Sequence, residues 1–364
     1  GINLIKANMS LKPVFYDPAI TYEENFSKGP FNINNINIVK NDKNPKYSFV
    51  GHKVNSPFGI AAGILLNSNH VKHAFDMGFD VVCYKTQRST TFPCNKYPNV
   101  VYLDVKGNLT LEKASKPIVG HSTTNKSLAE VTVTNSFGVP SKGPNFWVED
   151  LKKALSHQGK GQLLIMSVVG TIQKGFTELD YFDDFASTAK LAVESGAKVI
   201  EINLSCPNVA SEGVLCYTKA SVIEICKKTK QAIGNVPLIA KLGYFSKLQQ
   251  DTLKATIIEA SPYLSAVSVI NTIAAPIVDK YGNQLLPGPN RLKAGVCGKG
   301  IKWAGLDMVE RINKIRQGNN LNLQIIGVGG VMDPDDFKDY RSKGADLVQS
   351  ATAAMWNDNL ANQV

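Results

Sequence analysis

Three stretches of the chain follow one pattern: MGFDVVCYK (residues 77–85), SGAKVIEINLS (195–205) and KGADLVQSA (343–351). The second residue of each is a glycine at the end of a helical segment, and an apolar run follows it. Glycine adopts the left-handed conformation that ends a helix, and a run that is apolar on both faces is typical of a parallel strand covered by helices. The pattern predicts a helix–strand unit that is used at least three times.

Five more apolar runs have the length of buried strands: residues 56–62, 162–170, 236–242, 265–271 and 323–330. Amphipathic helical patterns lie between these runs. Their apolar faces are predicted to contain Phe182, Phe185, Ala189 and Val193 in one helix and Met308, Ile312 and Ile315 in another. Eight alternations in one chain favour an α/β fold with a closed (β/α)8 barrel, the TIM barrel, over an open sheet.

Two long segments interrupt this alternation, residues 86–143 after the second strand and residues 272–300 after the sixth. A TIM barrel carries its active site on the loops that follow its strands, so both insertions are expected to help build it. We assign residues 1–50 to an N-terminal extension, over the barrel bottom or at an interface, and residues 51–364 to the barrel. The chain ends soon after Thr352, so its C-terminus is expected to be truncated or to lack room for a last barrel helix.

The composition is that of a globular enzyme, with 43% hydrophobic and 19% charged residues. The formal charge is +10, but the Lys and Arg residues are scattered, so nucleic-acid binding is not expected and anionic small molecules are favoured. No run reaches the roughly 18 apolar residues of a membrane span, and the N-terminus does not resemble a signal peptide. These features predict a cytoplasmic protein with no membrane partner.

The six cysteines contain no CxxC pair and have no histidine at metal-ligand spacing. Neither a metal site nor a disulfide framework is therefore expected, which suits a reducing compartment. Five of the cysteines are interpreted as packing or incidental thiols: Cys83, Cys94, Cys216, Cys226 and Cys297.

A phosphate site is predicted from two loops, GVGG (residues 327–330) and SATAA (350–354), which follow the seventh and eighth strands. TIM barrels commonly bind phosphate at this place. Glycines allow backbone N–H groups to approach phosphate oxygens, and the second loop is expected to begin a helix whose N-terminus carries a positive dipole. Two tight turns without a ligand are the alternative.

Polar residues stand at the ends of several predicted strands, where a purely structural role does not explain them. They are Lys85, Asn203, Ser205, Lys241, Asn271 and Thr272. Amides and lysines that converge on one barrel mouth are costly to leave unpaired. As a set, they predict a polar ligand at the mouth.

The motif NLSCPN (residues 203–208) resembles the signature of the soluble class of dihydroorotate dehydrogenases, class 1, and is most similar to subtype A. The resemblance extends over about residues 55–354 and includes AAG (61–63), YKT (84–86), NSFGVP (135–140), AKL (240–242) and IIGVGG (325–330). Members of the family oxidise dihydroorotate to orotate with FMN. A base removes a proton from one ring carbon, and a hydride passes from the neighbouring carbon to N5 of the flavin.

The resemblance implies that Cys206 is the general base and that Lys85 lies between flavin and substrate. A thiol has an unperturbed pKa near 8.5, so a modest fall makes it an effective base at neutral pH. Asparagine amides offer both donors and acceptors to a pyrimidinedione edge. The implied substrate-binding residues are Lys85, Asn135, Phe137, Gly138, Val139, Asn203, Asn208, Asn271 and Thr272.

For the cofactor, the resemblance implies that Lys241 lies near flavin N1, where it stabilises the reduced anion. The full set of implied FMN-binding residues is Ala61, Ala62, Gly63, Lys85, Thr86, Asn203, Lys241, Gly298, Gly329, Gly330, Ala351 and Thr352. The loop from Pro207 to Tyr217 has a composition suited to a mobile lid or to an ordinary solvated loop.

The class further implies fumarate as the electron acceptor and a homodimer. Thr272 stands where the class usually has Ser, and AAG is more similar to the membrane-bound class, which leaves the acceptor open. Related dihydropyrimidine dehydrogenases carry their acid–base cysteine further along the loop, so Cys216 is an alternative base. Two other functions stay open: another FMN-dependent pyrimidine oxidoreductase, and a catalytically silent barrel that binds a phosphorylated ligand.

Overall fold

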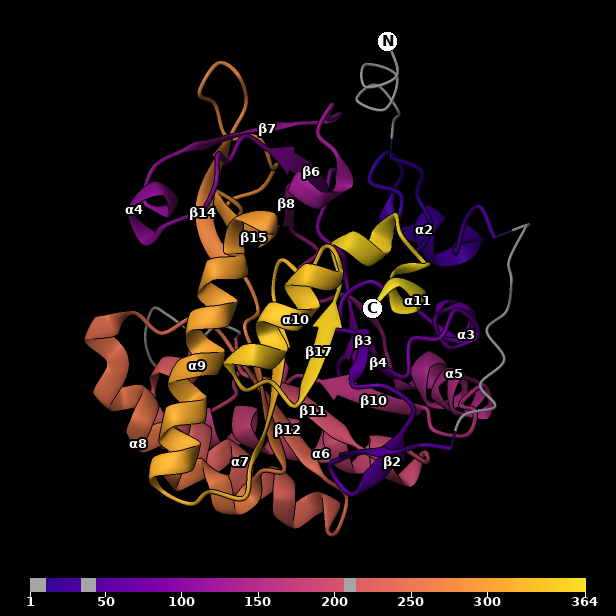
Figure 1. Ribbon diagram of the computed structural model, residues 1–364, viewed down its shortest axis with the longest axis vertical. Helices are drawn as coiled ribbons and strands as arrows, with labels where there is room; N and C mark the ends of the chain where they lie inside the picture. The colour runs from indigo at the N-terminus through magenta and orange to yellow at the C-terminus, as the bar shows by residue number, and fades with distance from the viewer. Residues whose placement is uncertain (1–10, 34–43, 206–213) are drawn as a thin grey trace.

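The structure, a computed structural model, describes residues 11–33, 44–205 and 214–364. Its centre is a closed barrel of eight parallel strands, each paired with the next barrel strand and the last with the first (Figure 1). The barrel strands are β3 (Phe58–Ile60), β4 (Val81–Gln87), β10 (Leu163–Val168), β11 (Ile200–Asn203), β12 (Leu238–Leu242), β13 (Ala266–Val269), β16 (Gln324–Val328) and β17 (Leu347–Ser350). Each strand overlaps one of the runs identified in the sequence, and the predicted TIM barrel is confirmed.

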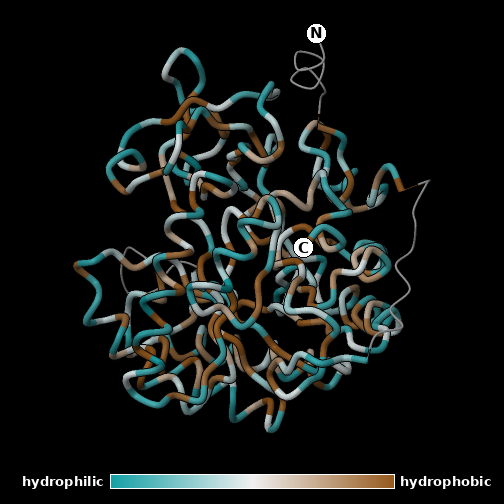
Figure 2. Tube along the Cα trace, viewed as in Figure 1, coloured by the Kyte–Doolittle hydropathy of each residue, from teal (hydrophilic) through white to brown (hydrophobic). Residues whose placement is uncertain are grey.

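Helices surround this barrel and bury their apolar faces against it. They are α3 (Ser68–Asp76), α5 (Pro144–Ser156), α6 (Glu178–Glu194), α7 (Lys219–Ile233), α8 (Gln250–Ala260), α9 (Lys302–Gly318) and α10 (Pro334–Lys343). The expected faces of α6 and α9 are buried, with Val193 only partly so. The three glycines of the repeated pattern have positive φ angles (Gly78 87°, Gly196 106°, Gly344 115°), as their role in ending helices requires. Figure 2 shows hydrophobic segments concentrated in the barrel.

A hairpin closes the barrel at the N-terminal ends of its strands. It consists of β1 (Tyr47–Phe49) and β2 (His52–Val54), which pair antiparallel. Phe49, Val50 and Val54 belong to the same apolar cluster as the lowest inward-facing strand residues, including Val81 and Leu163. The bottom of the barrel is therefore packed, so a ligand site has to lie at the opposite end.

Both insertions lie at the C-terminal end of the strands and form one small closed sheet there (Figure 1). Its strands, in spatial order, are β14 (Ile273–Val278), β15 (Lys293–Gly298), β8 (Thr132–Asn135), β6 (Val100–Leu103) and β7 (Ile118–His121). The first insertion also contains α4 (Leu111–Ala114) and the short strand β5 (Thr91–Phe92), which pairs with β9 (Ser141–Lys142). The expectation that the insertions help to build the barrel mouth is confirmed.

Residues 11–33 of the N-terminal extension pack at this mouth, whereas its last residues, 47–50, belong to the hairpin at the bottom, as expected for part of the extension. The part at the mouth includes α2 (Tyr22–Lys28). The ring of Tyr16 lies 5.3 Å from that of Phe137, and the ring of Tyr22 lies 5.8 Å from it. The backbone N–H groups of Val14 and Phe15 donate to the carbonyl of Met355 at 2.7 and 3.1 Å. Residues 11–33 thus brace loops that surround the candidate site.

After β17 the chain forms a single 3-10 turn, η6 (Ala353–Met355), and a short helix, α11 (Leu360–Gln363). The prediction that SATAA begins a helix is therefore wrong in that only a single 3-10 turn forms there. The carbonyl of Met355 accepts hydrogen bonds from the N-terminal segment, so it cannot continue a helical ladder.

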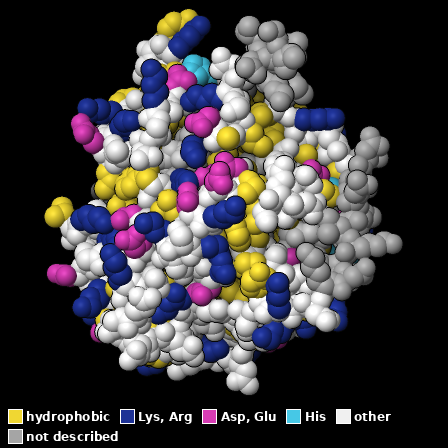
Figure 3. All heavy atoms as spheres, viewed as in Figure 1, with side chains coloured by type: hydrophobic (Ala, Val, Ile, Leu, Met, Phe, Trp, Pro, Cys, Tyr) yellow, Lys and Arg dark blue, Asp and Glu magenta, His cyan; other side chains and the backbone are white. Residues whose placement is uncertain are grey.

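On the face drawn in Figure 3, Lys and Arg side chains are interspersed with Asp and Glu. Within residues 11–33, 44–205 and 214–364, no helix has the length and apolarity to cross a membrane. The same residues contain no group of three or more His, Cys, Asp or Glu side chains placed to hold a metal ion.

Candidate active site

A cavity of about 670 Å³ opens between the barrel mouth and the small sheet above it. Thirteen of the residues expected from the sequence line it: Ala61, Ala62, Gly63, Asn135, Phe137, Lys241, Asn271, Thr272, Gly298, Gly329, Gly330, Ala351 and Thr352. They come from five different barrel strands and from both insertions, and only the fold brings them together.

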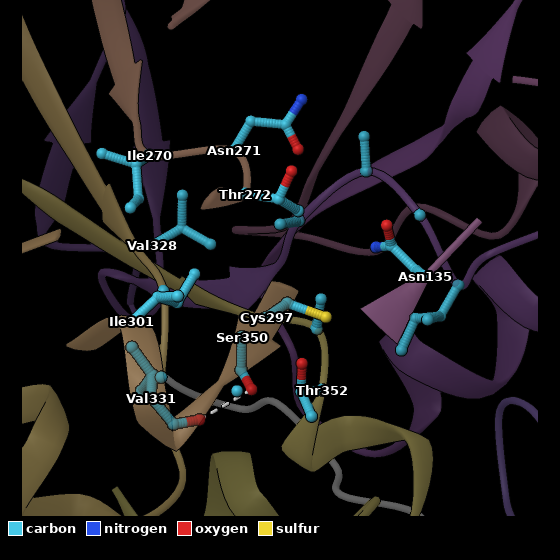
Figure 4. Close-up of a pocket in the computed structure, with 18 of the residues that line it drawn as sticks. Asn135, Ile270, Asn271, Thr272, Cys297, Ile301, Val328, Val331, Ser350 and Thr352 are labelled. Atoms are coloured by element: carbon cyan, nitrogen blue, oxygen red, sulfur yellow. Dashed lines mark hydrogen bonds between the residues drawn. The ribbon is translucent and has the colours of Figure 1, made fainter. Parts of the chain in front are cut away.

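One end of the cavity is a cradle of glycines. Gly298, Gly329 and Gly330 have φ angles of 94°, 128° and 66°, which favour glycine. A Cβ on Gly330 would lie 2.7 Å from Cβ of Lys302 and 2.8 Å from the carbonyl oxygen of Gly298. The hydroxyl of Ser350 donates to the carbonyl of Val331 at 2.9 Å (Figure 4). Gly329 and Gly330 line the cavity with backbone alone, so ligand oxygens can approach it, as a phosphate requires.

The other end of the cavity carries amide and hydroxyl groups. Asn271 and Thr272 follow β13, and Asn135 ends β8 (Figure 4). The amide of Asn271 donates to Oδ1 of Asn203 at 3.5 Å, and that oxygen also accepts from the backbone N–H of Ser205 at 3.0 Å. A Cβ on Gly295 would lie 2.4 Å from Oγ1 of Thr272, so β15 passes directly over this threonine. These groups can bracket a flat polar ring.

Lys85 is buried beside the cavity, between two residues that line it. Its Nζ donates to the carbonyl of Gly63 at 3.1 Å and lies 4.5 Å from the centre of the Phe137 ring. Burial lowers the pKa of Lys85 to about 8, against a smaller opposing effect of Cys94. The side chain of Lys85 therefore loses its positive charge as the pH rises through about 8, which is within the pH range of ordinary enzyme assays.

Several expected residues lie outside the cavity lining: Lys85, Thr86, Gly138, Val139 and Asn203. The hydroxyl of Thr86 lies 2.7 Å from that of Ser167 inside the barrel. The carbonyls of Gly138 and Val139 accept from the guanidinium of Arg88, at 3.4 and 2.8 Å. The expected base Cys206 and the expected ligand Asn208 lie outside the described residues.

The sequence analysis missed part of the cavity wall. Cys297, interpreted as an incidental thiol, lines the cavity, and burial raises its pKa to about 11. In Figure 4 it lies between Asn135 and an apolar wall that includes Ile270, Ile301 and Val328. Apolar wall residues of this kind have no signal in the sequence that separates them from the core. Among the described cysteines none forms a disulfide, and Cys83, Cys216 and Cys226 are buried.

Arg291, also missed, joins the two insertions. Its guanidinium donates to the carbonyls of Lys96, Pro98 and Pro287 at 2.7–3.1 Å. It also donates to the hydroxyl of Ser136 at 3.0 Å. The residue is only 5% exposed. Because Ser136 follows Asn135 directly, this arginine fixes the position of the amide at the cavity.

A closed barrel has a polar cavity at the carboxyl ends of its strands, and one end of that cavity is built from glycines after the seventh strand and from Ala351 and Thr352 after the eighth. This is the arrangement of a TIM-barrel enzyme. A family model described as dihydroorotate dehydrogenase matches residues 115–363. The chain belongs to the dihydroorotate dehydrogenase family.

Individual relatives agree with this assignment. A "Dihydroorotate dehydrogenase" of Dictyostelium discoideum is 36% identical over 359 residues, which cover 96% of each chain. A "Dihydroorotate dehydrogenase A (fumarate)" of Lactobacillus delbrueckii subsp. bulgaricus is 28% identical over 253 residues, 68% of this chain and 76% of the relative. A "Dihydroorotate dehydrogenase B (NAD(+)), catalytic subunit" of Petrotoga mobilis is 27% identical over 232 residues, 64% and 70% of the two chains.

The family prediction, a class 1 dihydroorotate dehydrogenase, is confirmed. The chain is an oxidoreductase that oxidises dihydroorotate in pyrimidine biosynthesis, and its family depends on a flavin. The cavity fits such a cofactor, because it joins a backbone cradle for an anionic tail to a broad apolar wall and a buried lysine.

Proposed function

We propose that this enzyme oxidises (S)-dihydroorotate to orotate in de novo pyrimidine biosynthesis and that its flavin is FMN. The observation that carries the choice of FMN is the glycine cradle of Gly298, Gly329 and Gly330, which suits a single terminal phosphate. Ala351 and Thr352 complete that end, and Ala61 to Gly63 flank the ring, with Thr86 deeper in the barrel. Bound FMN supplies the hydride acceptor.

The chain's own residues then hold the substrate and move one proton. Cys206 takes the proton from the ring carbon next to the one that loses the hydride, so the ring gains a double bond. Asn135, Asn203, Asn208 and Asn271 bracket the ring edge, with Thr272 and the segment from Phe137 to Val139 around it. The ammonium of Lys85, held at Gly63, attracts the anionic substrate. Lys241 places positive charge where the reduced cofactor carries negative charge.

Anaerobic mixing with dihydroorotate tests this proposal. The visible absorbance of the bound flavin is expected to bleach in one turnover, and orotate is expected to appear in equal amount. Uracil is expected to leave the reduced flavin unchanged, whereas reoxidation by uracil would indicate the alternative pyrimidine oxidoreductase. A purified protein that takes up no flavin would indicate the silent barrel.

We propose fumarate as the electron acceptor, as in subtype A. The support is the name of the Lactobacillus relative, while the Petrotoga relative is named for NAD⁺ and has nearly the same identity. Stopped-flow mixing of dihydroorotate-reduced enzyme with fumarate is expected to restore the flavin absorbance, and NAD⁺ is not. Reoxidation by NAD⁺ and not by fumarate would contradict the proposal and would make NAD⁺ the acceptor.

The homodimer, the cytoplasmic location and the boundary between residues 1–50 and 51–364 stay predictions.

The charge of Lys85 gives orotate binding a defined pH dependence. Because its pKa is lowered to about 8, the ammonium is present below that pH and is lost above it. The Kd of orotate is expected to rise about tenfold per pH unit above pH 8 and to stay flat between pH 6 and 7. Titration of the flavin absorbance with orotate measures this.

A Lys85→Met variant is the control for this titration. It is expected to bind orotate weakly at every pH and to show no break near pH 8. A wild-type Kd that does not change between pH 7 and 9.5 would remove Lys85 from the substrate site.

A further inference from the structure

The interior of the barrel contains a layer of polar side chains below the cavity. TIM-barrel interiors are filled mainly by branched apolar side chains. Here Cys83, Glu201, Ser268 and Gln349 point into the interior, and each is at most 1% exposed. Gln349 is satisfied, since its amide donates to the carbonyl of Val81 at 3.3 Å. Cys83 is also partnered, since its thiol lies 3.9 Å from Oε1 of Gln349 and interacts with the backbone of Ala62.

Glu201 is the unusual member of this layer. Its Oε1 and the hydroxyl of Ser268 are buried and have no hydrogen-bond partner among the described residues. A buried carboxyl without such partners is costly unless a positive charge lies near it. Burial raises the pKa of Glu201, and Lys241 opposes the rise. Cys83 is a further titratable group that interacts with Glu201.

The strand register explains why Glu201 and Lys241 interact. On β11 and β12, Glu201 is level with Ile239 and Asn203 is level with Lys241. Glu201 and Lys241 are therefore diagonal neighbours on the inner face of adjacent strands, one layer apart. Lys241 lines the cavity, and Glu201 lies below the lining. The carboxyl is thus placed beneath the lysine on the side away from the ligand.

We propose that Glu201 acts on the cofactor through Lys241: its carboxylate is the counter-charge that lies diagonally below this lysine, and it offsets part of the field of the ammonium at the cavity. This inference rests on the proposed placement of the flavin over Lys241. A nearby positive charge favours the reduced, anionic cofactor, and a negative charge disfavours it. In the interior both effects are weakly screened. Glu201 and Lys241 therefore set the flavin reduction potential in opposite directions.

The midpoint potential of the holoenzyme flavin, measured at pH 7 by anaerobic spectroelectrochemistry, tests this. Glu201→Gln keeps the size of the side chain and removes its charge, and a shift to a more positive potential is expected. Glu201→Asp keeps the charge and is expected to restore a potential near that of the wild type. Ser268→Ala, the matched control, removes a neutral group from the same layer and is expected to cause no shift.

An unchanged or more negative potential in Glu201→Gln overturns the inference. If Glu201→Gln and Glu201→Asp both fail to fold, the residue serves stability and the inference is also overturned. Lys241→Met separates this from the proposed function, because it is expected to shift the potential to more negative values. If Lys241→Met has no effect, the flavin does not lie over Lys241, and the placement itself is wrong.

Discussion

A Cys206→Ala variant is expected to stay yellow and to oxidise dihydroorotate about 10²–10⁴ times more slowly than the wild type, the usual contribution of a general base. Alanine cannot accept the proton from the substrate, so the proton removal that accompanies hydride transfer loses its base. Apart from Asn203, the implied flavin-binding residues lie in other parts of the chain, so the cofactor is expected to stay bound. Single-turnover bleaching of the flavin under anaerobic conditions measures the step directly.

Cys216→Ala is the matched control for this experiment. Cys216 is buried, and its backbone N–H donates to the carbonyl of Leu204 at 3.0 Å. Its replacement is expected to leave the bleaching rate within about threefold of the wild type, because it removes a thiol and no base. If Cys216→Ala is slow and Cys206→Ala is fast, Cys216 is the general base and Cys206 is not.

Filling the cavity at Ala351 is expected to abolish flavin binding. Ala351 lines the cavity next to Thr352, and a phenyl group there would occupy cofactor space. Overlap of this kind costs about 3 kcal/mol or more, so FMN affinity should fall at least about 100-fold in Ala351→Phe. Ligand binding to the folded state raises the melting temperature. Added FMN is therefore expected to raise the Tm of the wild type and not that of the variant.

Ala220→Phe provides the comparison for this substitution, because Ala220 is exposed on α7, away from the cavity lining. It is expected to bind FMN like the wild type. If Ala351→Phe is purified with a full complement of flavin, the cofactor does not occupy this cavity.

The barrel was predictable because its signals are local. Gly78, Gly196 and Gly344 end helices through their own backbone conformation, and the strands behind them are recognisable as continuous apolar runs. Gly329 and Gly330 of the cradle were predictable for the same reason, whereas Gly298 was implied only by the family resemblance. Their positive φ angles are a property of single residues.

The rest of the site depends on contacts between distant parts of the chain. Arg291 forms a hydrogen bond with Ser136, which lies more than 150 residues away in the sequence. No sequence pattern near either residue predicts this contact. The apolar wall formed by residues such as Ile270 has the same residue types as the core. The 3-10 turn after Ser350 is set by hydrogen bonds from Val14 and Phe15, so the local sequence alone predicted a helix there.

The small sheet over the barrel mouth pairs strand residues from the two insertions, with Asn135 opposite Gly295 and Ile118 opposite Ile277. During synthesis on the ribosome, the earlier partners emerge long before the later ones, and β3 must also wait for β17 to close the cylinder. Long-range pairings of this kind form late. A nascent chain therefore has no chamber for its cofactor until β17 has been translated, and capture of the flavin has to follow synthesis of that strand.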